Sequence, residues 1–173
     1  VYDLMAAFYT ACSSFMGQNL GAGKRDRVIK SYFVSLAYSF GSALVIGVCL
    51  AFFGREFLML FTKEPEVAAE GMERLRVMAF SYCVSAFMDC TIAASRGLGK
   101  SLVPTIIVIM GSCVFRVIWV YTVFAYFHTL PSLYLLYVFS WSITAIAEIS
   151  YFAHTWKKLG RVEMTAVPER QRV

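Results

Sequence analysis

Long uncharged stretches separated by short charged clusters dominate the chain. Residues 31–54 hold no charged side chain, and as a helix rising about 1.5 Å per residue this stretch exceeds the roughly 30 Å hydrocarbon core of a bilayer. Four more apolar stretches cover residues 4–20, 77–95, 101–127 and 132–155. The pattern predicts about five membrane-spanning helices.

A soluble helical bundle is the alternative fold. Buried helices of soluble proteins are usually shorter and amphipathic, whereas residues 31–54 have no polar face. Composition agrees, because 59% of residues are hydrophobic and 16% are charged, against roughly 25% charged in a soluble domain. We therefore predict an all-α, polytopic membrane helix bundle.

The positions of Lys and Arg predict the orientation of this bundle. The connections after the first, third and fifth spans hold 4, 2 and 5 basic residues, and the four basic residues after the second span are outnumbered by five Glu. Because cytoplasmic loops are enriched in Lys and Arg, we expect a cytoplasmic C-terminus. The net charge of +5 is explained in this way, without a nucleic-acid partner.

Neither a metal site nor an enzyme is indicated. The five cysteines lie singly in apolar runs, and His128 and His154 fall at opposite membrane faces. No nucleophile has a histidine and an orienting acid in reach. The stretch 97–101 is similar to the end of a phosphate-binding loop, but Ala94 stands where the first glycine is required.

Three ionisable side chains fall inside predicted spans: Asp89, Arg116 and Glu148. Each costs on the order of 2.5–3.5 kcal/mol in hydrocarbon, so each needs a partner, a water-filled cavity or a function. Asp89 shares a helix face with Tyr82 and Ser85, at spacings of three and four.

Two interpretations of these groups remain open. Asp89 binds a coupling proton or cation and Arg116 faces the transport pathway, or each is buried between helices and satisfied by polar neighbours. Helix rise places Asp89 roughly 10 Å and Arg116 roughly 22 Å from the cytoplasmic surface, so we do not expect them to pair. We expect Glu148, near the interface, to reach the headgroups.

The last two spans carry similar polar seams. In span 101–127 the seam is Thr105, Ser112 and Arg116, and in span 132–155 it is Tyr137, Thr144, Glu148 and Tyr151. We expect the seams of the last three spans to face a central cavity.

The stretch 16–27, MGQNLGAGKRDR, resembles the G-Q-N-x-G-A-G motif and basic loop of the multidrug and toxic compound extrusion (MATE) family. Residues 94–104, ASRGLGKSLVP, and 111–122, GSCVFRVIWVYT, resemble the C-terminal lobe of its bacterial members. The resemblance covers roughly residues 5 to 155.

This resemblance implies twelve helices in two six-helix lobes, which export organic cations and drugs by antiport against Na⁺ or H⁺, with no other cofactor. Residues 1–156 then form part of the C-terminal lobe, and residues 157–173 a polar cytoplasmic tail without ordered structure. The N-terminal lobe and one further helix are expected upstream of Val1.

The same resemblance assigns a structural role to four motif residues: Gly17, Gln18, Gly21 and Gly23. Some relatives carry a cation-binding carboxylate about one turn before Asp89, near Ser85. The family also implies a bacterial inner (plasma) membrane location. A flippase for lipid-linked saccharides and a non-transporting membrane subunit are the alternative functions.

Overall fold

The computed structural model of the chain describes residues 2–166, with side chains for residues 2–129 and 132–160. Three long helices come first, α1 (Tyr2–Gly21), α2 (Arg25–Met59) and α3 (Pro65–Gly97). One helical run follows, made of α4 (Leu102–Val108), the π-helix η1 (Ile109–Val114), α5 (Phe115–Trp119), the π-helix η2 (Val120–Phe124) and α6 (Ala125–Phe127). Helix α7 (Leu130–Ala166) ends the described chain.

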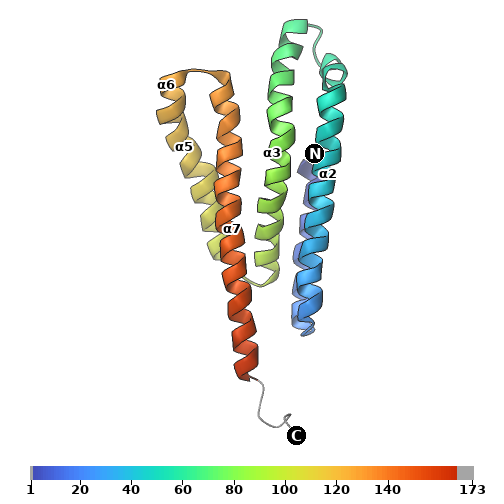
Figure 1. Cartoon of the computed structure of the whole chain (residues 1–173), viewed down its shortest axis with the longest axis vertical. Coiled ribbons are helices and arrows are strands. Elements are labelled where there is room, and N and C mark those ends of the chain that lie inside the picture. Colours follow the sequence, from blue (N-terminus) through green and yellow to red (C-terminus); the bar gives the residue numbers. More distant parts are fainter. Residues whose placement is uncertain (1, 167–173) are drawn as a thin grey trace.

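The helices run up and down in one bundle (Figure 1). Helix α2 packs on α1 and α3, α3 packs on α7, and the run from α4 to α6 returns along α7. The α1–α2 and α3–α4 turns and the C-terminal end of α7 lie at one end of the bundle, and the other two connections lie at the opposite end. The parts of the chain in which basic residues outnumber acidic ones thus share one end of the bundle.

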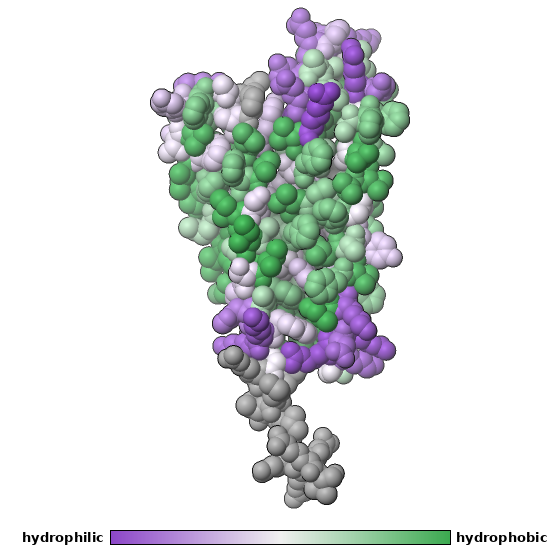
Figure 2. All heavy atoms as spheres, viewed as in Figure 1, coloured by the Kyte–Doolittle hydropathy of each residue, from purple (hydrophilic) through white to green (hydrophobic). Residues whose placement is uncertain are grey.

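The described chain contains four helices long and apolar enough to cross a membrane, at Arg25–Met59, Pro65–Gly97, Leu102–Phe127 and Ser132–Gly160. Figure 2 shows the matching surface, an apolar belt between two hydrophilic ends. The all-α membrane bundle is therefore confirmed. The predicted span 4–20 is a helix, α1, but it is not among the four, because polar residues at its C-terminal end, including Gln18 and Asn19, lower its hydropathy.

Three helices extend beyond the predicted spans. Helix α2 begins at Arg25, within the predicted basic loop. Helix α3 begins at Pro65, so the Glu-rich stretch before the third predicted span forms its first turns. Helix α7 continues to Ala166, and the expectation of no ordered structure after Trp156 is wrong for that stretch. The rest of the predicted tail, residues 167–173, lies outside the described residues. An apolar stretch in the sequence identifies only the part of a helix that lies in the hydrocarbon core. The helix itself continues into the headgroup region, where its polar side chains are solvated.

Glycines shape the basic end of the bundle. Gly23 has φ of 68°, a left-handed backbone conformation that favours glycine, and it closes α1. Gly97 lets α3 approach α1 closely, because a Cβ there would lie 2.8 Å from the Ser13 carbonyl oxygen. A Cβ on Gly17 would lie 3.5 Å from the Gly97 carbonyl oxygen, which is an ordinary contact.

The largest cluster of buried hydrophobic residues in the described structure lies toward the same end. It joins residues of α1, α2, α3 and α7: Cys12, Met16, Val28, Tyr32, Cys90, Ala94, Leu98 and Phe152. A cross-helix hydrogen bond of 2.9 Å links the hydroxyls of Tyr32 and Thr91, and the Tyr32 ring packs 4.8 Å from that of Phe152. These contacts hold α2, α3 and α7 together beside the polar groups described next.

Candidate functional site

Asp89 lies on α3 with a side chain only 8% exposed. The fully buried hydroxyl of Ser85, one turn earlier, donates a 2.7 Å hydrogen bond to Asp89 Oδ2. The two residues therefore share one helix face, as their spacing predicts. A bond to one carboxylate oxygen fixes the orientation of the group and leaves its other oxygen for a different partner.

Asp89 reaches a cavity of about 200 Å³ formed by α1, α3 and α4. Its lining is Tyr2, Tyr9, Asp89, Ile92, Ala93, Arg96 and Val108. The rings of Tyr2 and Tyr9 meet edge to face, with centroids 6.2 Å apart. One carboxylate beside two aromatic rings is the combination that attracts cations, through charge and through the ring quadrupoles.

Tyr82 does not join Asp89 as directly as the shared helix face suggests. Its ring packs 6.1 Å from that of Trp141 on α7, and its side chain also contacts the cluster of Met5, Ala43 and Ala86. Tyr82 therefore links α3 to its neighbours. Only Ser85, of the two predicted companions, is bonded to Asp89 in the described structure.

Arg116 is held between α5 and α7, away from Asp89. Its Nε donates a 3.1 Å hydrogen bond to Ser140 Oγ, and its guanidinium carbon lies 4.6 Å from the ring centre of Tyr137 and 5.8 Å from that of Trp141. The two groups thus have separate partners, as their different depths predict. Of the predicted seam on α7, Tyr137 contacts Arg116, while Thr144 bonds the Ser140 carbonyl of its own helix.

Sequence reasoning missed the geometry around Arg116. Two π-helical segments, η1 and η2, flank its short α-helical turn, and such segments re-aim the side chains beside them. Sequence reasoning also missed Ser140 as a partner. The spacing of Tyr137, Ser140, Trp141 and Thr144 places them on one face of α7, and that periodicity was the available signal.

Glu148 corrects another expectation. We expected it to reach the headgroups, but its side chain is fully buried, and neither carboxyl oxygen has a hydrogen-bond partner in the described structure. The physical reason is that α7 runs on past Thr155, so Glu148 lies well inside the helix and within the bundle. The buried hydroxyl of Ser95 on the adjacent α3 is also without a partner.

Arg96 lies near Asp89, because it lines the same cavity. The charge pattern predicts for Arg96 only a place in the connection after the third span. An exposed cation at the end of α3, at the cavity that Asp89 lines, is instead part of the electrostatic environment of the candidate site.

Fold and site together define a multi-pass membrane protein with two separate sets of polar groups between its helices, one around Asp89 on α1, α3 and α4 and one around Arg116 on α5 and α7. The family follows from sequence: the model of the MatE family matches residues 1–122, more than half of the chain. The chain belongs to the MatE family, a family of transporters and not of enzymes. No curated protein matches the chain.

Proposed function

We propose that this chain forms part of the C-terminal lobe of an antiporter that exports organic cations and drugs in exchange for H⁺ or Na⁺. Membership in the MatE family supports transport in general. The observation that carries the finer proposal is the buried carboxylate of Asp89, oriented by Ser85 and opening onto a cavity with two tyrosine rings.

In this proposal Asp89 binds the coupling ion and the organic cation in turn. Both are positively charged, so one carboxylate cannot neutralise both at once, and competition between them couples their movements. Arg96 lines the same cavity and repels cations, so it favours release of the coupling ion when the site opens to the cytoplasm. Alternating access then comes from rocking of two lobes about the site.

The proposed location is the bacterial inner membrane, with the end that carries Lys24, Arg27 and Lys30 in the cytoplasm. The enrichment of basic residues at that end supports this orientation. A reporter enzyme that is active only in the periplasm, fused after Val173, tests this orientation. Activity of the fusion would contradict it.

Asp89→Asn in the full-length transporter tests the function. We expect cells to lose ethidium efflux and drug resistance while the protein is still made and inserted. Asp26→Asn, at the exposed start of α2, is the matched control and should transport normally. A lipid-linked saccharide flippase or a non-transporting subunit predicts no resistance from the wild-type gene, so that result would reject the proposal.

Proteoliposomes identify the coupling ion. If uptake is driven by an inward or outward pH gradient without Na⁺, the ion is H⁺; if a Na⁺ gradient is required at constant pH, the ion is Na⁺. In either case Asp89→Asn should remove the dependence on the driving gradient.

A further inference from the structure

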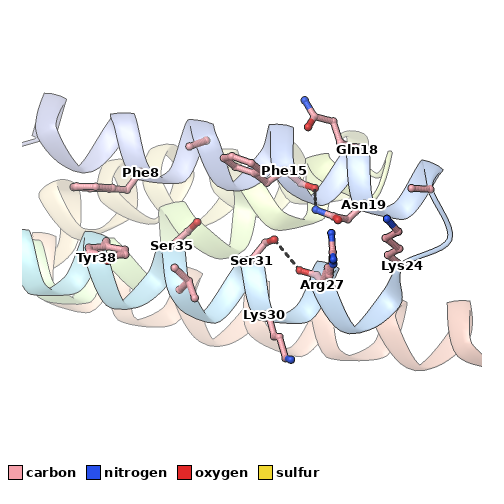
Figure 3. A pocket seen from close by; sticks show the side chains of 13 residues that line it. Phe8, Phe15, Gln18, Asn19, Lys24, Arg27, Lys30, Ser31, Ser35 and Tyr38 are labelled. Atoms are coloured by element: carbon pink, nitrogen blue, oxygen red, sulfur yellow. Dashed lines mark hydrogen bonds between the residues drawn. The ribbon is translucent and has the colours of Figure 1, made fainter.

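A large groove lies between α1 and α2, on the surface of the bundle and separate from the Asp89 cavity. Its volume is about 720 Å³. The lining residues are Phe8, Ala11, Phe15, Gln18, Asn19, Ala22, Lys24, Arg27, Lys30, Ser31, Val34, Ser35 and Tyr38. Figure 3 shows them on two facing helices.

The two ends of the groove differ in chemistry. The end toward the α1–α2 turn carries Lys24, Arg27 and Lys30, and the lining includes no Asp or Glu. The other end is apolar and is closed by Phe8 and Tyr38, whose rings stack with centroids 5.7 Å apart. In Figure 3 the rings stand at one end of the groove and Lys24 and Arg27 at the other.

Three cationic side chains at the basic end of the groove can bind an anion. Lys24, Arg27 and Lys30 are exposed, and Lys24 directly precedes α2, whose N-terminal end carries partial positive charge. Neighbouring polar groups are already engaged locally: Asn19 Nδ2 donates to the Phe15 carbonyl, and Ser31 Oγ donates to the Arg27 carbonyl. In the part of the chain that the structure describes, the three cations, rather than these groups, remain able to bind a ligand.

The apolar end exposes three side chains suited to contact with hydrocarbon. Phe15 is 57%, Val34 53% and Tyr38 61% exposed. From Arg27 to Tyr38 the helix rises about 16 Å, which is close to half of the roughly 30 Å hydrocarbon core. The groove therefore has the length of one acyl chain in a single leaflet, with its charges at the headgroup level.

We propose that this groove binds an anionic phospholipid of the cytoplasmic leaflet. Lys24, Arg27 and Lys30 contact the phosphate, and one acyl chain lies between α1 and α2 against Phe15, Val34 and Tyr38. Basic pockets between membrane helices are suited to anionic headgroups by charge complementarity. This site does not depend on the transported substrate.

Lipid binding to the purified full-length protein in a neutral detergent tests the proposal. Native mass spectrometry, with titration of phosphatidylglycerol or phosphatidylcholine, gives the affinity of each lipid. We expect phosphatidylglycerol to bind at least tenfold more tightly. Each cation near an anionic headgroup contributes about fivefold at low salt, so the triple variant K24Q/R27Q/K30Q should lose roughly a hundredfold in affinity.

A matched variant, K63Q/R74Q/R76Q, removes three exposed cations from the opposite end and should bind phosphatidylglycerol like the wild type. Ala11→Phe fills the apolar part of the groove and should weaken both lipids, whereas Ala125→Phe, on the exposed surface of α6, should not.

Three results would overturn the proposal: equal affinity for the two lipids, unchanged binding in K24Q/R27Q/K30Q, or full displacement of the lipid by inorganic phosphate at equal concentration. The last would mean that the site recognises phosphate alone. Because the readout is lipid mass, a failure here leaves the proposed antiport untouched, and loss of efflux in Asp89→Asn leaves the lipid site untouched.

Discussion

Ser140 Oγ on α7 donates a 2.8 Å hydrogen bond to the backbone carbonyl of Gly111 in η1, and the same oxygen accepts the 3.1 Å bond from Arg116 Nε. One hydroxyl thus ties the π-helical backbone to the guanidinium group. The close approach depends on Gly111, because a Cβ there would lie 3.1 Å from Thr144 Cβ and closer still to its hydroxyl oxygen. This contact fixes α7 against the run from α4 to α6.

Gly111→Ala should therefore destabilise the bundle, by about 1–3 kcal/mol as for other overpacked sites. Thermal unfolding in detergent measures the effect. Gly41→Ala is the control: a Cβ there meets nothing within 4 Å, so the change should be neutral or slightly stabilising because alanine favours a helix. An unchanged unfolding midpoint for Gly111→Ala would contradict the close packing of Gly111 against Thr144.

Arg116→Lys should not behave as a conservative change. Lysine keeps the charge but loses the Nε bond to Ser140 and the planar group above Tyr137. We expect a loss of about 1–3 kcal/mol in the free energy of unfolding, most of what Arg116→Gln costs. Tyr137→Leu should lower the cost of Arg116→Lys, since it removes part of the same contact. Wild-type stability in Arg116→Lys would mean that charge alone matters.

Thr91→Val should cost more than Tyr32→Phe, although both break the same 2.9 Å hydrogen bond. In Tyr32→Phe the Thr91 hydroxyl keeps its 2.7 Å bond to the Phe87 carbonyl, so only about 0.5–1.5 kcal/mol is lost. In Thr91→Val the buried Tyr32 hydroxyl loses the partner it has, at about 1–3 kcal/mol.

The double variant Tyr32→Phe/Thr91→Val should then be more stable than Thr91→Val alone. Chemical denaturation of the four proteins gives the complete cycle. Equal costs for the two single variants would indicate that another group or a water molecule bonds Tyr32.

Glu148→Leu should stabilise the protein, because both carboxyl oxygens of Glu148 are buried without a hydrogen bond in the described structure. Replacing an unsatisfied polar group by an apolar one of similar size is expected to gain about 1–3 kcal/mol. Glu70→Leu, on the exposed start of α3, should change stability by less than about 0.5 kcal/mol. Destabilisation by Glu148→Leu would reveal a partner or bound ion at this carboxyl.

Most of the fold could be predicted because placing a charged side chain in hydrocarbon costs a large free energy. Charged residues are therefore rare over the whole length of each membrane-spanning segment. The uncharged run 31–54 lies inside α2, and the pairing of Ser85 with Asp89 follows directly from helical spacing. The separation of Asp89 from Arg116 likewise follows from counting residues along helices of known rise.

The remaining features depend on packing between helices, which a local pattern does not contain. The burial of Glu148 requires knowing that α3 lies against α7, and the place of Arg96 at the Asp89 cavity requires the positions of α1 and α4. The π-helical segments beside Arg116 arise within a stretch whose residues are all compatible with an ordinary α-helix. The basic groove needs two adjacent helices before its residues can be seen as one surface.

The close approach of α1 to α3 at Gly97 restricts how these two helices can move. A slip of α3 by one residue would bring Arg96 or Leu98 against the Ser13 carbonyl oxygen, where only a hydrogen at Cα fits. Sliding between α1 and α3 is thereby locked at the basic end. Any conformational change of the protein must then move α1 and α3 together as one rigid unit. The hinge of such a change lies outside the contact between these two helices.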